Sequence, residues 1–177
     1  MSKALVIIDV QKGMWANPAY PPYDGEGVLR RIGDLIAKAR AGGVPVMYVQ
    51  HHDLDNSDHP FKPGKEGYPF HDAIAPLAGD DVTVKHCSSA FHGTDFDAKL
   101  KRAGIDHLVV TGMQSEYCVD SAVRGAVERG YTVTLVSDAH STGDTRVAKA
   151  RDIIAIQNDT MSGSFARVVP AAEVSFV

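Results

Sequence analysis

The segment L-V-V-T-G-M-Q-S-E-Y-C-V-D-S-A-V, residues 108–123, contains the change from strand to helix on which our prediction of the fold depends. Leu108–Thr111 is a continuous apolar and β-branched run, which predicts a buried strand. Gly112 then indicates a turn, and Ser115 is a suitable N-cap for a helix that begins near Glu116. Farther along, apolar residues recur at the spacing of one helix face. A buried strand that leads into an amphipathic helix is typical of an α/β protein.

Cys118 lies in the first turn of this predicted helix. Free backbone N–H groups and the positive end of the helix dipole favour a thiolate there, which would make the side chain a nucleophile. The alternative is that Cys118 is a small buried apolar side chain, the usual role of a free cysteine. The segment by itself leaves both interpretations open.

Composition and charge limit the class of protein. The chain has 177 residues, 44% hydrophobic and 23% charged, so we expect one globular domain over residues 1–177. The net charge is −4 and no run of Lys or Arg occurs, which argues against a nucleic acid or an anionic membrane as partner. The N-terminal apolar run is too short for a membrane span and is broken by Asp9. Cys87 and Cys118 form no disulfide framework, so we expect a cytoplasmic protein with reduced thiols.

Strand and helix patterns alternate along the rest of the chain, which predicts a doubly wound sheet of six mainly parallel strands. The long stretch between residues 51 and 80 contains several Pro and Gly residues, which predicts a functional loop with little regular structure. The predicted strands are Ala4–Val10, Val44–Gln50, Asp81–Lys85, Leu108–Thr111, Tyr131–Ser137 and Phe165–Val169. The predicted helices cover Val28–Ala39, Asp95–Ala103, the segment after Glu116, and about Asp144–Asn158.

Three chemically active residues follow strands of this predicted sheet. Asp9 ends the first strand, Lys85 ends the third, and Cys118 follows the fourth by one turn of chain. Ligands of doubly wound sheets bind at the carboxyl ends of the strands, where the strand order reverses. Each residue taken singly fits a capping or turn role. Taken together they form a plausible nucleophile, base and electrostatic stabiliser.

The same residues lie in motifs that resemble a known family. D-V-Q at residues 9–11, K-H-C-S-S-A-F at residues 85–91 and G-M-Q-S-E-Y-C-V at residues 112–119 occur in the order and spacing of the isochorismatase-like cysteine hydrolase superfamily. This superfamily includes nicotinamidases and N-carbamoylsarcosine amidase-like enzymes. The resemblance covers essentially the whole chain, and it identifies Asp9, Lys85 and Cys118 as the catalytic triad.

The resemblance implies further features of fold and site. It implies a three-layer α/β/α fold with strand order 3-2-1-4-5-6 and a cis peptide bond between Met113 and Gln114. It also implies an oxyanion hole made by the backbone N–H groups of Gln114 and Cys118, although Gln114 is larger than the residues common at that position. Oligomers are usual in the superfamily, so we expect a homo-oligomer.

The predicted activity is hydrolysis of a C–N bond in a small-molecule amide, urea or carbamoyl compound through a thioester on Cys118. Asp9 would take the thiol proton, and Lys85 would orient the carboxylate and offset negative charge. We expect the substrate pocket to be lined by residues that lie in or follow the three motifs: Gln11, Trp15, Phe91 and Tyr117. Core packing is the alternative role of the three aromatic side chains, and we favour it for Phe91.

We expect no cofactor and no metal. His51, Asp53, His59 and His71 have spacings similar to the nicotinamidase metal site, but the order of the first two ligands is reversed. Four alternatives remain open: a nicotinamidase with a metal in this loop, a non-catalytic small-molecule-binding protein, an isochorismatase that cleaves a vinyl ether, and a redox protein that pairs Cys87 with Cys118. The cysteine argues against the isochorismatase, whose members generally lack that nucleophile.

Overall fold

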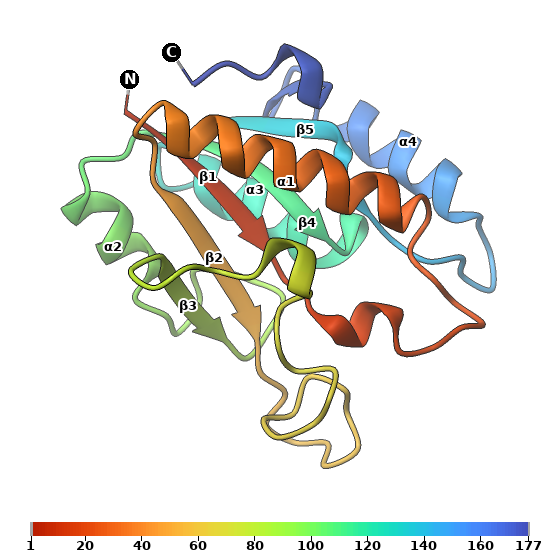
Figure 1. Ribbon diagram of the computed structural model, residues 1–177. Helices are drawn as coiled ribbons and strands as arrows, with labels where there is room; N and C mark the ends of the chain where they lie inside the picture. Colours follow the sequence, from red (N-terminus) through yellow and green to blue (C-terminus); the bar gives the residue numbers. More distant parts are fainter. Residues whose placement is uncertain (1, 177) are drawn as a thin grey trace.

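The structure is a computed structural model that describes residues 2–176. One parallel sheet has the strand order β3-β2-β1-β4-β5-β6, which confirms the predicted α/β fold and its strand order (Figure 1). The strands are β1 (Lys3–Ile8), β2 (Val46–His51), β3 (Asp81–Lys85), β4 (His107–Met113), β5 (Thr132–Ser141) and β6 (Arg167–Val169). The order reverses between β1 and β4, so the carboxyl ends of these two strands mark the switch point.

In the described part of the chain, four α-helices cover the sheet: α1 (Gly25–Ala41), α2 (Phe96–Arg102), α3 (Asp120–Val127) and α4 (Ala150–Met161). Alternate side chains of β1 point to opposite faces, so Leu5 and Ile7 pack in the cluster with α1, whereas Val6 and Ile8 pack in the cluster with α2 and α3. Figure 1 shows α1 across one face and α3 behind the other. Both faces are therefore buried, which explains the continuous apolar runs of the central strands.

The long loop between β2 and β3 contains a single short 3₁₀ turn, η2 (Asp72–Ile74), in agreement with the prediction. It extends beyond the end of the sheet in Figure 1 and returns beside the segment after β1. There it forms backbone hydrogen bonds from Lys12 N–H to the Pro69 carbonyl and from Gly13 N–H to the Gly67 carbonyl. No helix within residues 2–176 is long and apolar enough to cross a membrane.

Several predicted boundaries differ from the structure. The helix predicted from about Asp144 begins at Ala150, because the Asp144 carboxylate accepts a hydrogen bond from the Ala150 N–H and holds the intervening residues as a loop. Strand β5 continues past the predicted end to Ser141. Thr94 bonds the Phe96 N–H as a helix cap would, although α2 itself begins only at Phe96.

The largest difference concerns the segment that carries the cysteine. Ser115–Val119 forms a π-helical turn, η3, and α3 follows directly from Asp120. The Ser115 side chain does not cap this helix; its hydroxyl is hydrogen-bonded to Nδ1 of His140, at 2.8 Å. π-Helical turns are frequent at functional sites.

Candidate active site

Asp9, Lys85 and Cys118 meet at the switch point of the sheet. The Nζ atom of Lys85 lies 2.7 Å from Oδ2 of Asp9 and 3.1 Å from Sγ of Cys118. The side chains of Asp9 and Lys85 are fully buried, whereas Cys118 is partly exposed. The thiol is therefore the group of the three that can meet a molecule from solvent.

The backbone after β1 turns the Asp9 side chain inward. Asp9 has φ of +49°, a left-handed conformation that is uncommon for residues other than glycine, and its N–H donates to the Val49 carbonyl at 2.9 Å. The apolar run of β1 thus ends in a carboxylate placed at the centre of the sheet edge. A buried charge of this kind is costly unless it is paired, and Lys85 supplies the pairing.

The Lys85 ammonium has more acceptors than protons. Besides Asp9 and Cys118, Nζ contacts the Cys87 carbonyl oxygen at 2.9 Å and Nδ1 of His51 at 3.3 Å. An ammonium donates three hydrogen bonds, so these four acceptors compete for its protons. The four acceptors hold Nζ of Lys85 between them. The hydrogen bond from Nζ to the Cys118 sulfur can become stronger when another acceptor gives up its share of the protons.

The electrostatics correct our expectation of a preformed thiolate. Burial and the neighbouring Asp9 carboxylate raise the pKa of Cys118 to about 12, against the opposing effect of Lys85. Burial also raises the pKa of Asp9, although Lys85 and a hydrogen bond with Cys118 pull it down. The resting sulfur therefore favours the thiol, and the neighbouring Asp9 carboxylate is more basic than an exposed one.

His51 is a neutral neighbour of the triad. Burial and the Lys85 ammonium lower the pKa of His51 to about 4, so its Nδ1 atom accepts from the ammonium. Sequence reasoning considered His51 only as a metal ligand. Its position at the end of β2, between the strands that carry Asp9 and Lys85, is the signal that could have placed it beside the triad.

The segment between β4 and Cys118 has the implied backbone geometry. The peptide bond between Met113 and Gln114 is cis, as the family resemblance implies. The Gln114 carbonyl accepts from the N–H groups of Tyr117 and Val119, at 3.2 and 3.1 Å. These bonds fix the turn on which the cysteine lies.

The four residues predicted to line the pocket occupy different environments. Gln11 is fully buried, and its side-chain amide bonds the backbone of His51 and Tyr68. It therefore anchors the long loop to the site, and its amide is already occupied by protein. Trp15 is half-buried with its ring 4.8 Å from that of His71, and Tyr117 is 55% exposed.

Phe91 belongs to the core, which is the role we favoured for it over a place in the pocket. Its ring is 6% exposed and packs against Phe96 and Tyr131, with the Arg129 guanidinium 4.6 Å from its centre. These contacts come from α2 and from the segment between α3 and β5, on the covered face of the sheet. Trp15 and Tyr117 remain predictions as pocket residues.

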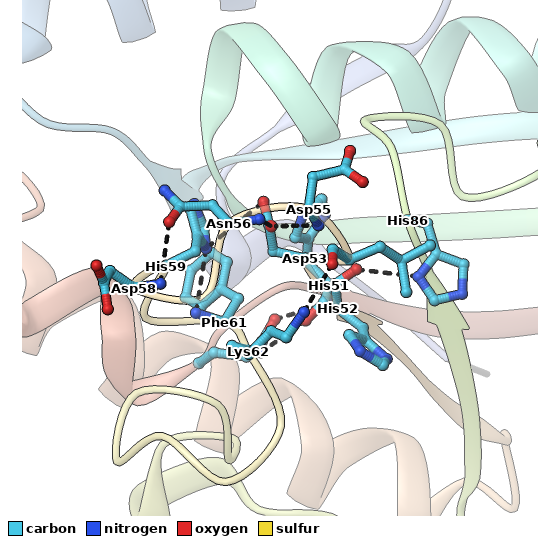
Figure 2. A network of polar contacts seen from close by, with 12 residues as sticks. His51, His52, Asp53, Asp55, Asn56, Asp58, His59, Phe61, Lys62 and His86 are labelled. Carbon is cyan, nitrogen blue, oxygen red and sulfur yellow. Dashed lines mark hydrogen bonds and ion pairs between the residues drawn. The ribbon is translucent and has the colours of Figure 1, made fainter.

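Three of the four loop residues with metal-like spacing lie near one another, with the His51 and His59 ring centroids 6.2 Å apart, whereas His71 bonds elsewhere. His59 Nδ1 lies 3.9 Å from Oδ2 of Asp53, while His71 Nδ1 accepts from the Ala73 N–H (Figure 2 shows the Asp53 and His59 region). Within residues 2–176, the group whose donor atoms come within 4.8 Å of one another is Asp9, His51 and Cys118. The Lys85 ammonium contacts all three of these residues, so a cationic group of the protein already holds them together.

Cys87 takes part in the site through its backbone. Its carbonyl oxygen accepts from Lys85, whereas its thiol faces the Ser89 carbonyl at 3.8 Å, and both cysteines are free. The redox interpretation required Cys87 as a disulfide partner of Cys118. The contact that Cys87 makes with the site is instead the hydrogen bond from Lys85 to its carbonyl oxygen, which helps to position the ammonium.

Comparisons with known proteins show the family and the same fold. The isochorismatase domain model matches residues 3–172. The uncharacterized isochorismatase family protein YddQ of Bacillus subtilis is 38% identical, over 80% of this chain and 79% of its own. A streptothricin hydrolase of Streptomyces noursei is 35% identical over 82% of this chain, which spans 57% of that protein.

Two further proteins show the breadth of the similarity. The ureidoacrylate amidohydrolase RutB of Methylobacterium radiotolerans is 27% identical over 82% of this chain and 70% of its own. The crystal structure of an isochorismatase from Pseudomonas putida superimposes with a TM-score of 0.90 and 30% identity, over 98% of this chain and 90% of that one.

Proposed function

This chain belongs to the isochorismatase family of hydrolases, and we propose that it cleaves the C–N bond of a small-molecule amide, urea or carbamoyl compound with Cys118 as nucleophile. One observation carries the proposal. A buried carboxylate and a buried ammonium, 2.7 Å apart, adjoin a partly exposed thiol. This is a nucleophile with an adjacent base and an orienting cation.

The first step is attack of sulfur on the substrate carbonyl carbon. The Cys118 thiol gives its proton to Asp9 as the S–C bond forms and the carbonyl π electrons move to oxygen. While the proton leaves, the Lys85 ammonium bonds the sulfur more strongly, because partial negative charge develops on sulfur until the S–C bond forms and because the Asp9 partner becomes neutral. A thiol with a pKa of about 12 is rarely ionised at neutral pH, so it needs a base to take its proton during the attack. Asp9 is positioned to be that base.

The second half of the reaction reverses the proton transfer. Protonated Asp9 gives its proton to the departing amine as the C–N bond breaks, which leaves an acyl group on Cys118 and a carboxylate on Asp9. A water molecule then adds to the thioester while Asp9 accepts its proton, and that proton returns to the departing sulfur. The triad thus ends in its starting state.

The negative oxygen formed in each addition needs hydrogen-bond donors. We assign this role to the backbone N–H groups of Gln114 and Cys118, at the turn between β4 and α3. One such donor is worth about 3–4 kcal/mol of barrier in other acyl-transfer enzymes. Because the donors belong to the backbone, the large side chain of Gln114 does not alter the chemistry.

The substrate class rests on the chemistry of the site and on one relative. An acyl-transfer triad acts on carbonyl carbons that carry a leaving group, and the name of a relative with 27% identity, an amidohydrolase, points to an amine as that group. Lys85 supplies positive charge beside the base, so the proposed reaction requires no metal ion. Function on a shared fold depends on the site rather than on the scaffold.

A paired substrate screen tests the proposal. Small primary amides, ureas and carbamoyl compounds are incubated with the wild type, Cys118→Ala and Cys87→Ala, and released ammonia or amine is measured. We expect turnover by the wild type and the Cys87 variant and none by the Cys118 variant, whose far-UV spectrum should stay native. Appreciable turnover by Cys118→Ala, or no turnover of any compound by the wild type, would contradict the proposal.

The same proteins separate the rival activities. Peroxide consumption that depends on both cysteines would indicate the redox protein. Cleavage of a vinyl ether that survives Cys118→Ala would indicate the isochorismatase reaction. Loss of amide turnover after dialysis against a chelator, restored by zinc, would indicate a loop metal site.

A further inference from the structure

A chain of buried polar groups lies behind the segment that carries Cys118. His140 Nδ1 lies 2.8 Å from Oγ of Ser115, and His140 Nε2 lies 2.9 Å from Oδ1 of Asn158. Ser115 is fully buried and His140 is 1% exposed. The proposed reaction uses neither side chain, so a buried titratable group beside the nucleophile segment requires an explanation.

The hydrogen bonds fix the tautomer of His140. The Asn158 amide nitrogen donates to the Ser137 carbonyl at 3.0 Å, so its amide oxygen is the atom that faces His140. An amide oxygen only accepts, so Nε2 of His140 carries a proton. Burial lowers the pKa of His140, which keeps the ring neutral and leaves Nδ1 as an acceptor. The Ser115 hydroxyl must therefore donate to Nδ1.

This network joins three elements at one point. His140 lies opposite Gly112 in the register of β4 and β5, Asn158 belongs to α4, and Ser115 is the first residue of η3. The pairing of β4 with β5 shifts register between Val110 and Gly112, which places His140 at the end of β4. The ring thus connects the rigid sheet and α4 to the residue that directly follows Gln114.

We propose that neutral His140 is a positioning residue, which holds the Ser115 hydroxyl and thereby sets the Gln114 and Cys118 peptide groups for the oxyanion. This inference rests on the proposed hydrolase function. A hydrogen bond to Ser115 restricts both its side chain and the turn that begins there. A misplacement of about 1 Å at a reacting centre can lower the rate about 100-fold.

Two substitutions test the two hydrogen bonds of His140 separately. In His140→Asn, the side-chain oxygen has the same number of bonds to the backbone as Nδ1 and can accept from Ser115, but the bond to Asn158 is lost. In His140→Gln, the side-chain nitrogen replaces Nε2 and can donate to Asn158, but the acceptor for Ser115 is lost. Each variant therefore loses one of the two hydrogen bonds and keeps the other.

The test measures kcat, KM and Tm for both variants on the best amide substrate of the wild type. We expect His140→Gln to lower kcat about 100-fold with little change in KM, because the lost positioning acts in the transition state. We expect His140→Asn to keep most of the wild-type kcat, although the two Tm values should fall by similar amounts. If kcat falls equally in both variants, or if the loss of kcat in each variant parallels its loss of Tm, the His140 ring is only structural and the inference is wrong.

Ser115→Ala provides the second variant. It removes the hydroxyl while leaving His140 and Asn158 in place, so we expect it to lower kcat as His140→Gln does. The double variant Ser115→Ala/His140→Gln should lose no more than either alone, because both remove the same contact. Additive losses in the double variant would overturn the inference.

A spectroscopic measurement keeps this inference separate from the proposed function. ¹⁵N NMR of histidine-labelled protein should show His140 protonated at Nε2 and unprotonated at Nδ1 at neutral pH. A ring protonated at Nδ1 overturns the inference while leaving the proposed hydrolase intact. A wild type with the expected tautomer but no turnover in the amide screen instead overturns the proposed function, and the positioning role with it.

Discussion

Nζ of Lys85 lies 3.1 Å from Sγ of Cys118, although β2 and β1 separate β3 from β4 in the sheet. The lysine reaches this position by crossing the end of β2 and contacting His51 on the way. Asp9, at the end of β1, then lies between the two strands that carry the cation and the nucleophile. The three residues thus lie at or just beyond the carboxyl ends of three strands, β1, β3 and β4, and the proposed chemistry depends on their relative charges.

Alkylation of Cys118 should report a high thiol pKa. Since burial and Asp9 raise the pKa of Cys118 to about 12, the rate of reaction with iodoacetamide should still rise above about pH 9. An unperturbed cysteine, with a pKa of ~8.5, would have begun to level off there. The measurement uses Cys87→Ser, so that Cys118 is the remaining thiol, and mass spectrometry identifies the site. A plateau reached below neutral pH would show a preformed thiolate.

Asp9→Asn should lose most activity because it removes the proposed base. General acid–base catalysis contributes about 10²–10⁴-fold, so kcat should fall by at least the lower value. In the wild type, kcat/KM should fall as the pH drops through the Asp9 pKa, which burial raises above 3.8, because only the carboxylate accepts the thiol proton. Asp58→Asn, at a carboxylate of the same loop that is 91% exposed, is the control and should keep the wild-type profile. A wild-type acid limb centred below pH 3.8 would contradict this role.

Lys85→Met should make stability depend more steeply on pH. Without the ammonium, the buried Asp9 carboxylate is uncompensated, so its pKa rises further above the unfolded value of 3.8. The folded state then binds the proton more tightly than the unfolded state, so the free energy of unfolding falls as pH rises through the folded pKa. Breaking a buried pair costs about 3–5 kcal/mol when the remaining charge stays ionised.

Urea denaturation of Lys85→Met and wild type at pH 5 and pH 8 checks this expectation. The variant should recover part of its lost stability at the lower pH, where Asp9 takes up a proton. Lys101→Met is the matched control, because Lys101 forms an exposed ion pair with Asp97. A stability loss in Lys85→Met that is equal at both pH values would contradict a dominant effect of Asp9.

Gln11→Leu should loosen the long loop. The Gln11 amide accepts from the His51 N–H and donates to the carbonyls of His51 and Tyr68. Gln50 also donates to the Tyr68 carbonyl, so the substitution leaves the two backbone groups of His51 without this partner. Each unsatisfied buried group costs about 1–3 kcal/mol. Urea denaturation should therefore show a clear loss, and limited proteolysis should show cleavage in the loop.

Gln50→Leu is the control for this prediction. It removes the bond to the Tyr68 carbonyl at 3.0 Å, but that oxygen keeps its bond from Gln11 at 2.7 Å. Its stability loss should therefore be the smaller one. Equal losses in the two variants would show that Gln11 is not the anchor of the loop.

The sequence determined the fold class and the candidate triad. Apolar runs that end at Asp9 and Lys85, and a strand that leads into the Cys118 segment, place all three residues at one sheet edge once the sheet is parallel. These conclusions follow from short-range patterns, because strand character and strand ends depend on neighbouring residues. The motif resemblance added the strand order and the cis peptide bond, both of which the structure confirms.

Only the tertiary structure decided the protonation of the site and the partners of its supporting residues. The expected thiolate depended on a local view of a helix terminus, whereas the pKa of Cys118 depends on burial and on Asp9, which is more than a hundred residues away in the chain. Likewise, Ser115 is a residue type typical of a helix N-cap at the predicted start of a helix, but its hydroxyl is hydrogen-bonded to His140 of β5. Burial and long-range contacts are properties of the assembled sheet, so no local pattern encodes them.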